Sequence, residues 1–238
     1  MGTIDIAHTT VPETYDARIA AGFLPYLARD YEELGRVFAH DAYLPKVMEG
    51  IMAEQGLKFL GYFCEGFIGI GLTKPANQPA TPGVEKGVLC RVPGNDAFKL
   101  PVEYLGYRTS TLPYADVFAA LQTGVVDGWS GGPPNMNYLN YRDLIKNYYQ
   151  YNVNHEATQF YMNADCFNGL SPADRDVVLE AFRKQSVKSL ETASQQDEKY
   201  LAMLAEKGIN VTIFSDEELA AIAAGVRENV WPKLAKSY

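Results

Sequence analysis

The sequence predicts an α/β protein, and three observations support this class. Short apolar strands alternate along the chain with helices whose apolar residues recur at helical spacing. A strand–helix–strand unit stands out between Gly87 and Gly128, and a stretch from Ala173 to about Glu206 contains no proline or glycine. Because strands that alternate with helices favour crossover connections, we expect the sheets to be parallel.

The elements before the proline-rich stretch 74–83 are expected to be short. They are a strand over 3–8, helices over 31–39 and 46–55, and a buried strand over 57–63. A loop from Thr9 to Pro12 follows the first strand and could face a ligand. Residues 65–71 are rich in glycine and aromatic side chains. This composition fits either a bulged strand or backbone that approaches a ligand.

The unit that begins at Gly87 places an arginine inside an apolar strand. Val88 to Val92 reads as that strand, with Arg91 in it, and residues 93–96 turn the chain. A guanidinium in a strand needs an anion or a set of acceptors. Arg91 is therefore expected to bind either a ligand carboxylate or an internal aspartate, with Asp96 and Asp127 as the internal alternatives.

A helix over 114–123 and a second strand complete this unit. Val117, Phe118 and Leu121 define one helix face, and Gly124 occupies the position of a left-handed C-terminal cap. Val125 and Val126 resume a strand, which an Asp-Gly turn follows. The segment 130–135, Ser-Gly-Gly-Pro-Pro-Asn, is expected to be a loop at the carboxyl end of a strand, where open α/β sheets bind ligands.

The C-terminal third predicts one long helix, one strand and one final helix. Ser171 is expected to cap the long helix, with Pro172 at its first position and Asp174 three residues after the cap. A coiled coil is the structural alternative, but the heptads are not sustained. A strand over 209–214 follows, and Ser215 caps a helix to about residue 233.

Composition excludes several classes of protein. The 238 residues carry a formal net charge of −8 and no run of lysine or arginine, so nucleic acid and anionic membranes are not expected partners. The sequence contains no stretch of 18 apolar residues of the kind that inserts into a membrane. Residues 1–5 lack the basic start and apolar segment of a signal peptide. No metal or cofactor is expected, because the three histidines are scattered. For the three cysteines, Cys64, Cys90 and Cys166, three free thiols and one disulfide with a leftover are equally open.

The order of motifs resembles the solute-binding proteins of tripartite ATP-independent periplasmic (TRAP) transporters, of the dicarboxylate-receptor type. That family has a Gly-x-Lys-x-Arg-Val-Pro strand, a helix ending in Ala-Leu-Gln-x-Gly, and then Val-Asp-Gly. Here these motifs read Gly87 to Pro93, with Leu89 in place of the lysine, then residues 120–124 and 126–128. The segments Leu24-Pro25-Tyr26-Leu27 and Gly2-Thr3-Ile4-Asp5 match as well.

The resemblance implies a two-lobed periplasmic-binding-protein-like fold with a long helix that spans both lobes. Lobe I would comprise residues 1–67 and 157–196, and lobe II residues 68–156 and 197–238. Family members begin with an export signal and a strand–helix–strand, whereas this sequence opens at the family's second strand. We therefore expect a chain without its N-terminal segment, located in the periplasm.

The resemblance also implies where a ligand binds. In the family the arginine that matches Arg91 pairs with a ligand carboxylate, and a bidentate, charge-assisted contact explains why an arginine is used. Tyr114 and Trp129 match family positions whose side chains lie against the ligand. The alternative for each is that its side chain belongs to the hydrophobic core. Weaker candidates are Gly131, where some members carry a ligand-binding asparagine, Asn135 as its substitute, and Phe67, Thr10 and Gln159.

Three functions are weighed. The first is a binding protein that captures an organic acid and delivers it to the membrane permease subunits of a TRAP transporter. The others are a sensor domain without transport and an α/β enzyme, although the sequence lacks a nucleophile elbow and the common phosphate-binding motifs. Phe67, Ile68 and Gly69 stand where acidic-sugar binders carry a second arginine, which predicts a monocarboxylate with an apolar or aromatic body.

Overall fold

The computed structural model describes residues 4–11 and 15–237 and divides the chain into two compact units. Unit 1 comprises the described residues up to Gly22 together with Asp30–Glu65 and Ala157–Ser194. Unit 2 comprises Phe23–Arg29, Gly66–Glu156 and Gln195–Tyr238. The segment 23–29, which the sequence reading assigned to lobe I, thus lies in unit 2. The first residues of the Gly2-Thr3 motif, and Pro12, lie outside the described residues.

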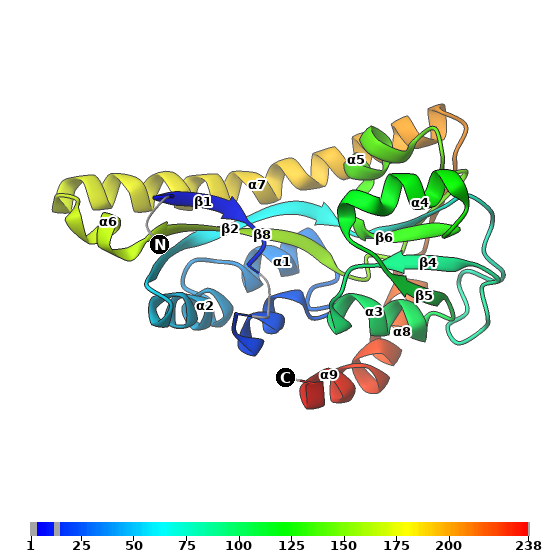
Figure 1. Ribbon diagram of the computed structural model, residues 1–238, viewed down its shortest axis with the longest axis horizontal. Coiled ribbons are helices and arrows are strands. Elements are labelled where there is room, and N and C mark those ends of the chain that lie inside the picture. Colours follow the sequence, from blue (N-terminus) through cyan, green and yellow to red (C-terminus); the bar gives the residue numbers. More distant parts are fainter. Residues whose placement is uncertain (1–3, 12–14, 238) are drawn as a thin grey trace. The chain divides into compact units, whose positions relative to one another are not determined.

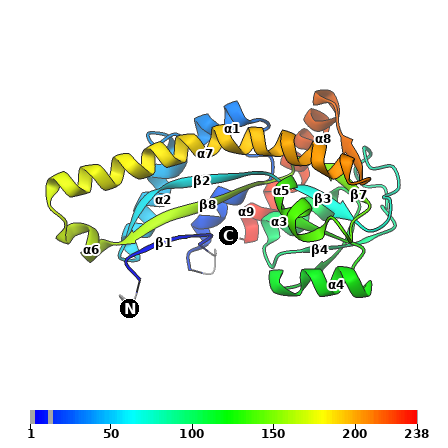
Figure 2. The same cartoon turned by 90° about the horizontal axis from the view of Figure 1, so that it is seen from above.

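Unit 1 contains a three-stranded sheet with the strand order β1-β8-β2 (Figure 2). β1 pairs antiparallel with β8, with Ile6 opposite Met162 and Thr9 opposite Gln159. The buried side chains Leu60, Phe160, Met162 and Phe167 form a core cluster in this unit. The elements that begin in unit 1 are β1 (Ile6–Thr9), the 3₁₀ helix η1 (Ala17–Phe23), α1 (Tyr31–Val37), α2 (Tyr43–Glu54), β2 (Leu57–Phe67), α6 (Ala164–Gly169) and α7 (Pro172–Glu206).

Unit 2 contains a six-stranded sheet with the order β5-β4-β6-β3-β7-β9. Its strands are β3 (Gly69–Leu72), β4 (Leu89–Val92), β5 (Arg108–Thr111), β6 (Gly128–Gly132), β7 (Asn147–Gln150) and β9 (Asn210–Ile213); β8 (His155–Asn163) begins in unit 2 and enters unit 1. Its helices are α3 (Asp96–Tyr104), the 3₁₀ turn η2 (Tyr114–Asp116), α4 (Val117–Thr123), α5 (Pro134–Met136), the π-helical turn η3 (Asn137–Tyr141), α8 (Asp216–Asn229) and α9 (Trp231–Ser237).

The expectation of wholly parallel sheets is wrong. β4 pairs parallel with β5 and β6, and β7 pairs parallel with β9. However, β3 lies antiparallel to both of its neighbours, β6 and β7. β3 enters this sheet directly from β2, a strand of the other sheet, after the single residue Ile68, so no crossover helix makes it parallel to its neighbours. The alternation of strands and helices therefore does not predict the direction of β3.

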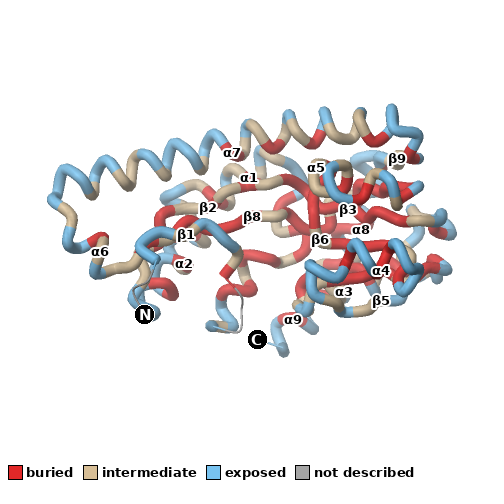
Figure 3. The backbone as a smooth tube through the Cα atoms, turned by 45° about the horizontal axis from the view of Figure 1, so that its top comes forward, coloured by how far each residue is buried: buried red, intermediate tan, exposed pale blue. Residues whose placement is uncertain are grey.

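The long helix is confirmed, and α7 runs unbroken from unit 1 into unit 2 (Figure 1). Ser171 caps it as expected: its Oγ accepts a hydrogen bond from the backbone N–H of Asp174 and donates one to the Asp174 carboxylate. The first half of the helix is mostly exposed or half-buried, and Ser189 is its first fully buried residue (Figure 3).

Two elements of unit 2 were not foreseen. α3 and β5 follow the turn after β4. Asn95 caps α3, because its side-chain oxygen accepts a hydrogen bond from the N–H of Ala97 at 2.7 Å. Pro101 lies inside this helix and obscures its pattern in the sequence.

Two further features of the described chain concern its disulfides and its capacity to span a membrane. Cys64, Cys90 and Cys166 form no disulfide with one another, so the disulfide alternative does not apply to this structure. Among the described helices, none combines the length and the apolar character that crossing a bilayer requires.

Candidate ligand-binding site

Arg91 lies at the centre of the parallel half of the unit 2 sheet. Its strand, β4, sits between β5 and β6, and Arg91 is the register partner of Ser110 on one side and Trp129 on the other. The residue is only 4% exposed, and its Nε donates a hydrogen bond to the carbonyl oxygen of Leu112 at 2.8 Å. This bond orients the guanidinium plane.

No acidic side chain of the described chain neutralises Arg91. Asp127 is already engaged: its carboxylate accepts a hydrogen bond from the N–H of Leu89 at 2.8 Å and pairs with Lys74 at 2.9 Å. Asp96, the other internal alternative, begins α3 and forms no ion pair with Arg91. Within residues 4–11 and 15–237, the two terminal nitrogens of Arg91 make no hydrogen bond to the protein. The guanidinium therefore retains its fork of donors for another acceptor.

The electrostatics of the site favour an anion. Burial lowers the pKa of Arg91 from its ordinary value, while the hydroxyl of Tyr141, the thiol of Cys90 and the hydroxyl of Tyr114 act in the opposite sense. Arginine remains protonated in proteins, so the buried positive charge carries a desolvation cost. A carboxylate at the free nitrogens would offset this cost.

Three aromatic residues, Tyr114, Trp129 and Tyr141, cluster in the neighbourhood of Arg91. The centroids of Tyr114 and Trp129 lie 6.0 Å apart, and those of Trp129 and Tyr141 lie 4.7 Å apart in an edge-to-face arrangement. Tyr114 stands at the start of η2 and is 47% exposed, and its hydroxyl accepts a hydrogen bond from the side-chain amide of Asn140. Burial and the neighbouring Tyr114 hydroxyl raise the pKa of Tyr141, which keeps that phenol neutral.

Trp129 differs from the expectation in two respects. It lies within β6 rather than in a loop, and it is completely buried in the core of unit 2. Its indole N–H donates to the side-chain oxygen of Asn137 at 2.8 Å, and Asn137 in turn donates to the carbonyls of Gly132 and Pro133. The expected free indole donor is therefore already used, because α5 and η3 bring Asn137 back onto β6.

Gly131 leaves space next to the guanidinium for another group. Its φ is +144°, a conformation that side chains rarely adopt. A Cβ there would lie 3.1 Å from Nη1 of Arg91 and 3.4 Å from Cζ3 of Trp129. Asn135, the expected substitute, uses its side-chain oxygen to accept a hydrogen bond from the N–H of Met136 at 2.7 Å.

A family model described as bacterial extracellular solute-binding protein, family 7, matches residues 1–237. The chain belongs to this family. The resemblance on which the sequence reading relied is thereby confirmed, and so is the class of solute-binding protein.

Curated relatives and solved structures agree with this family. The chain is 23% identical to the sialic acid-binding periplasmic protein SiaP of Vibrio cholerae over 89% of its own length and 65% of the relative's. It is 28% identical to the C4-dicarboxylate-binding periplasmic protein DctP of Rhodobacter capsulatus over 78% of its own length and 54% of the relative's. The chain thus spans between about half and two thirds of the length of these relatives.

A solved structure shares the fold of this chain. DctP7 of Bordetella pertussis, an extracytoplasmic solute receptor binding pyroglutamic acid, aligns with a TM-score of 0.80 at 22% identity, covering 98% of this chain and 76% of that one. This likeness supports the two-lobed α/β fold.

The remaining candidates of this family 7 chain belong to unit 1 or are engaged in hydrogen bonds. Gln159 is fully buried, and its side-chain oxygen accepts a hydrogen bond from the N–H of Val11 at 2.9 Å. Gln159 and the half-buried Thr10 belong to unit 1, where Gln159 fixes the segment after β1. Phe67, in unit 2, is 2% exposed, and its N–H donates to the carboxylate of Asp197. Ligand roles for these three residues stay predictions.

Sequence reasoning missed Tyr141, Asn137 and the Leu112 carbonyl. Tyr141 and Asn137 lie on η3, which follows Pro133 and Pro134. No sequence motif marks either residue. The carbonyl of Leu112 carries no side-chain signal at all. The buried hydroxyl of Ser130 has no hydrogen-bond partner among the described residues.

Proposed function

We propose that this chain is the solute receptor of a TRAP-type transporter and that it captures an organic acid through Arg91. The observation that carries the proposal is a buried guanidinium whose Nε is fixed on the Leu112 carbonyl and whose other nitrogens have no acidic partner in the described chain. Bidentate pairing with a carboxylate uses this fork. Membership of the extracellular solute-binding family supports capture and release rather than catalysis.

The preferred ligand is a monocarboxylate with an apolar or aromatic body. Support comes from the surroundings of Arg91, where the side chains of Tyr114, Trp129 and Tyr141 present rings. Curated relatives are named for sialic acid, C4-dicarboxylates and ectoine, so the family accommodates different ligands. Pyroglutamic acid, bound by the structurally similar receptor, has a single carboxylate on a compact ring. This chemistry fits one arginine among aromatic side chains.

Delivery of the acid to membrane permease subunits, from the periplasm, completes the proposed role. It is supported by the family's description and by the periplasmic relatives. Arg91, Tyr114, Trp129 and Gly131 all belong to unit 2, so the carboxylate would be anchored by that unit.

Calorimetric titration with a panel of acids tests the proposal. The panel contains aromatic and branched monocarboxylates, pyroglutamate, malate, glucuronate and sialic acid, and each preferred acid is matched with its primary amide. Binding of a monocarboxylate, no binding of its amide, and no product in the recovered ligand are the expected results. Tight binding of glucuronate without any apolar acid would reject the ligand class, and absence of binding across the panel would reject the receptor role.

A further inference from the structure

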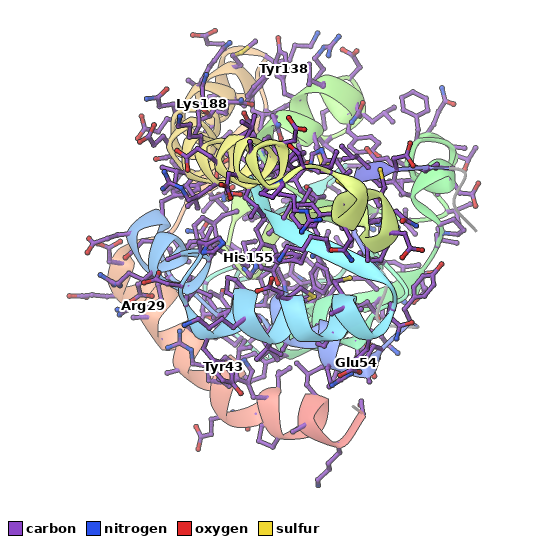
Figure 4. All side chains as sticks on the ribbon, turned by 90° about the vertical axis from the view of Figure 1, so that its left-hand side faces the viewer. Arg29, Tyr43, Glu54, Tyr138, His155 and Lys188 are labelled. Atoms are coloured by element: carbon purple, nitrogen blue, oxygen red, sulfur yellow. The ribbon has the colours of Figure 1, made fainter. Side chains whose placement is uncertain are left out.

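Unit 1 contains a cavity of its own, of about 420 Å³. Its walls come from four elements of that unit: α1 with the residues after it, α2, β2 and α7. In Figure 4, Tyr43 and Glu54 mark the two ends of α2. The lining is mainly apolar and includes Phe38, Pro45, Phe59, Leu60, Leu179 and Leu190. Small-molecule sites in proteins usually have volumes of about 300–1,000 Å³ and mainly apolar linings, so this cavity falls within their range.

Two lining residues carry a buried hydroxyl that has no hydrogen-bond partner within residues 4–11 and 15–237. They are Tyr62 on β2, which is 3% exposed, and Ser186 on α7. Buried polar atoms are normally paired, because an unmet hydroxyl loses its hydrogen bonds to water without replacement. The wall of the cavity therefore contains unpaired polar atoms, although neither oxygen is itself reached from the open space.

The two cations that line the cavity are already paired. Lys58 forms an ion pair with Glu49, and Arg183 forms one with Glu180 at 2.7 Å. An anionic ligand would have to break one of these pairs. The other acidic lining residue, Asp41, is exposed, so the lining favours an uncharged ligand.

We propose that this cavity is a second ligand site, which binds a small, uncharged and mainly apolar organic molecule. It is independent of the organic-acid site, since its lining residues all belong to unit 1 whereas Arg91 belongs to unit 2. The volume fits a fused-ring or short-chain compound that carries one hydroxyl or carbonyl group.

Gly35 offers a way to fill the cavity. It lines the cavity from α1, and a Cβ there would meet only Cδ1 of Leu190, at an ordinary contact distance of 3.8 Å. Gly35→Leu should therefore place a side chain in the cavity without displacing backbone. Gly50 gives a matched control: it lies in helix α2 outside the lining, and a Cβ there would meet nothing within 4 Å. Gly50→Leu makes the same chemical change outside the cavity.

The probe is 2-naphthol, which is uncharged at pH 7. Its binding to wild type, Gly35→Leu, Gly50→Leu and Arg91→Lys is followed by calorimetry and by the melting temperature. Saturable binding to wild type, with unchanged affinity in Gly50→Leu and Arg91→Lys, is the expected result. In Gly35→Leu the affinity should fall by about tenfold or more, because the side chain occupies the same volume.

A second variant guards against misfolding of the first. Val187 lines the cavity from α7 and is 51% exposed, so Val187→Phe should fold and should also weaken 2-naphthol binding. The proposal is overturned if wild type does not bind 2-naphthol, or if both cavity variants bind it as wild type does. It is also overturned if Arg91→Lys abolishes binding. Self-association that Gly35→Leu removes, in the absence of 2-naphthol binding, would instead assign the cavity to a second copy of the chain.

Discussion

Unit 2 contains two buried cations, and their surroundings differ in a way that separates structure from function. Lys86 is 1% exposed and Arg91 is 4% exposed, and burial lowers the pKa of both. The Nζ of Lys86 donates hydrogen bonds to the carbonyls of Gln78 and Thr81, which closes the proline-rich connection on itself. Among the described residues, Arg91 makes a single such bond, through Nε. Burial therefore does not identify a binding cation; the donors left without an acceptor do.

Arg91→Lys should have the largest effect on binding. A lysine replaces a planar fork with a point charge, so affinity for the captured acid should fall by about 1.5–3 kcal/mol. Calorimetry at one pH measures the loss. Arg108→Lys, on the neighbouring strand β5 and exposed, is the matched control and should leave affinity unchanged. If Arg91→Lys also binds as wild type does, the contrast between the two cations disappears and Arg91 is structural.

Gly131→Ala should weaken acid binding by placing a methyl group next to the Arg91 guanidinium. The added methyl group would lie 3.1 Å from Nη1 of Arg91, at a φ of +144°. Strain at such a φ should lower the free energy of unfolding by about 1–3 kcal/mol, with a parallel loss of acid affinity. Urea denaturation and calorimetry measure the two effects. Gly94→Ala, where the new Cβ would meet Thr111 at 3.5 Å, should change neither; equal affinity in both variants would show that Nη1 is not used.

Lys86→Met should affect stability without affecting binding. The substitution removes the donor from the carbonyls of Gln78 and Thr81 and also removes a buried charge, so the net loss in the free energy of unfolding should be about 1 kcal/mol. Urea denaturation measures this loss, and calorimetry should give the wild-type affinity. A large drop in acid affinity would mean that Lys86, and not Arg91 alone, supplies the positive field.

The substitution Asp127→Asn should change the free energy of unfolding in a way that depends on pH. Burial opposes ionisation of the Asp127 carboxyl group, but the N–H of Leu89 and the ammonium of Lys74 hold the pKa of Asp127 below its ordinary value of 3.8. Its contribution to stability is therefore present at neutral pH and is lost as the pH falls through the lowered pKa. Asp127→Asn should cost about 1 kcal/mol at pH 7 and progressively less in acid. A constant difference between pH 7 and pH 2.5 would contradict this assignment.

The sequence predicted the local elements better than their pairing. The caps at Ser171 and Ser215 and the left-handed Gly124 form as expected, with φ of +73° at Gly124, because each depends on residues a few positions away. The helix face read as Val117, Phe118 and Leu121 is only partly right, since Phe118 is 48% exposed. The neighbouring Ala120 is buried instead.

The candidate site shows the same limit. Sequence reasoning chose Arg91, Tyr114, Trp129 and Gly131, and the structure brings these four together in unit 2. It could not predict that Asn137 takes the indole N–H of Trp129, because η3 must first fold back onto β6. Nor could it find Tyr141, which no motif marks.

The sequence by itself determined the family, most of the strands and helices, and an arginine within an apolar strand that requires a partner. Only the tertiary structure decided that the partner is not one of the described protein's own carboxylates. Cap formation depends on neighbouring residues, whereas the state of Arg91 depends on a carbonyl 21 positions along the chain and on Asp127 being held by Lys74. Whether a buried charge is satisfied is decided by groups that only folding brings together.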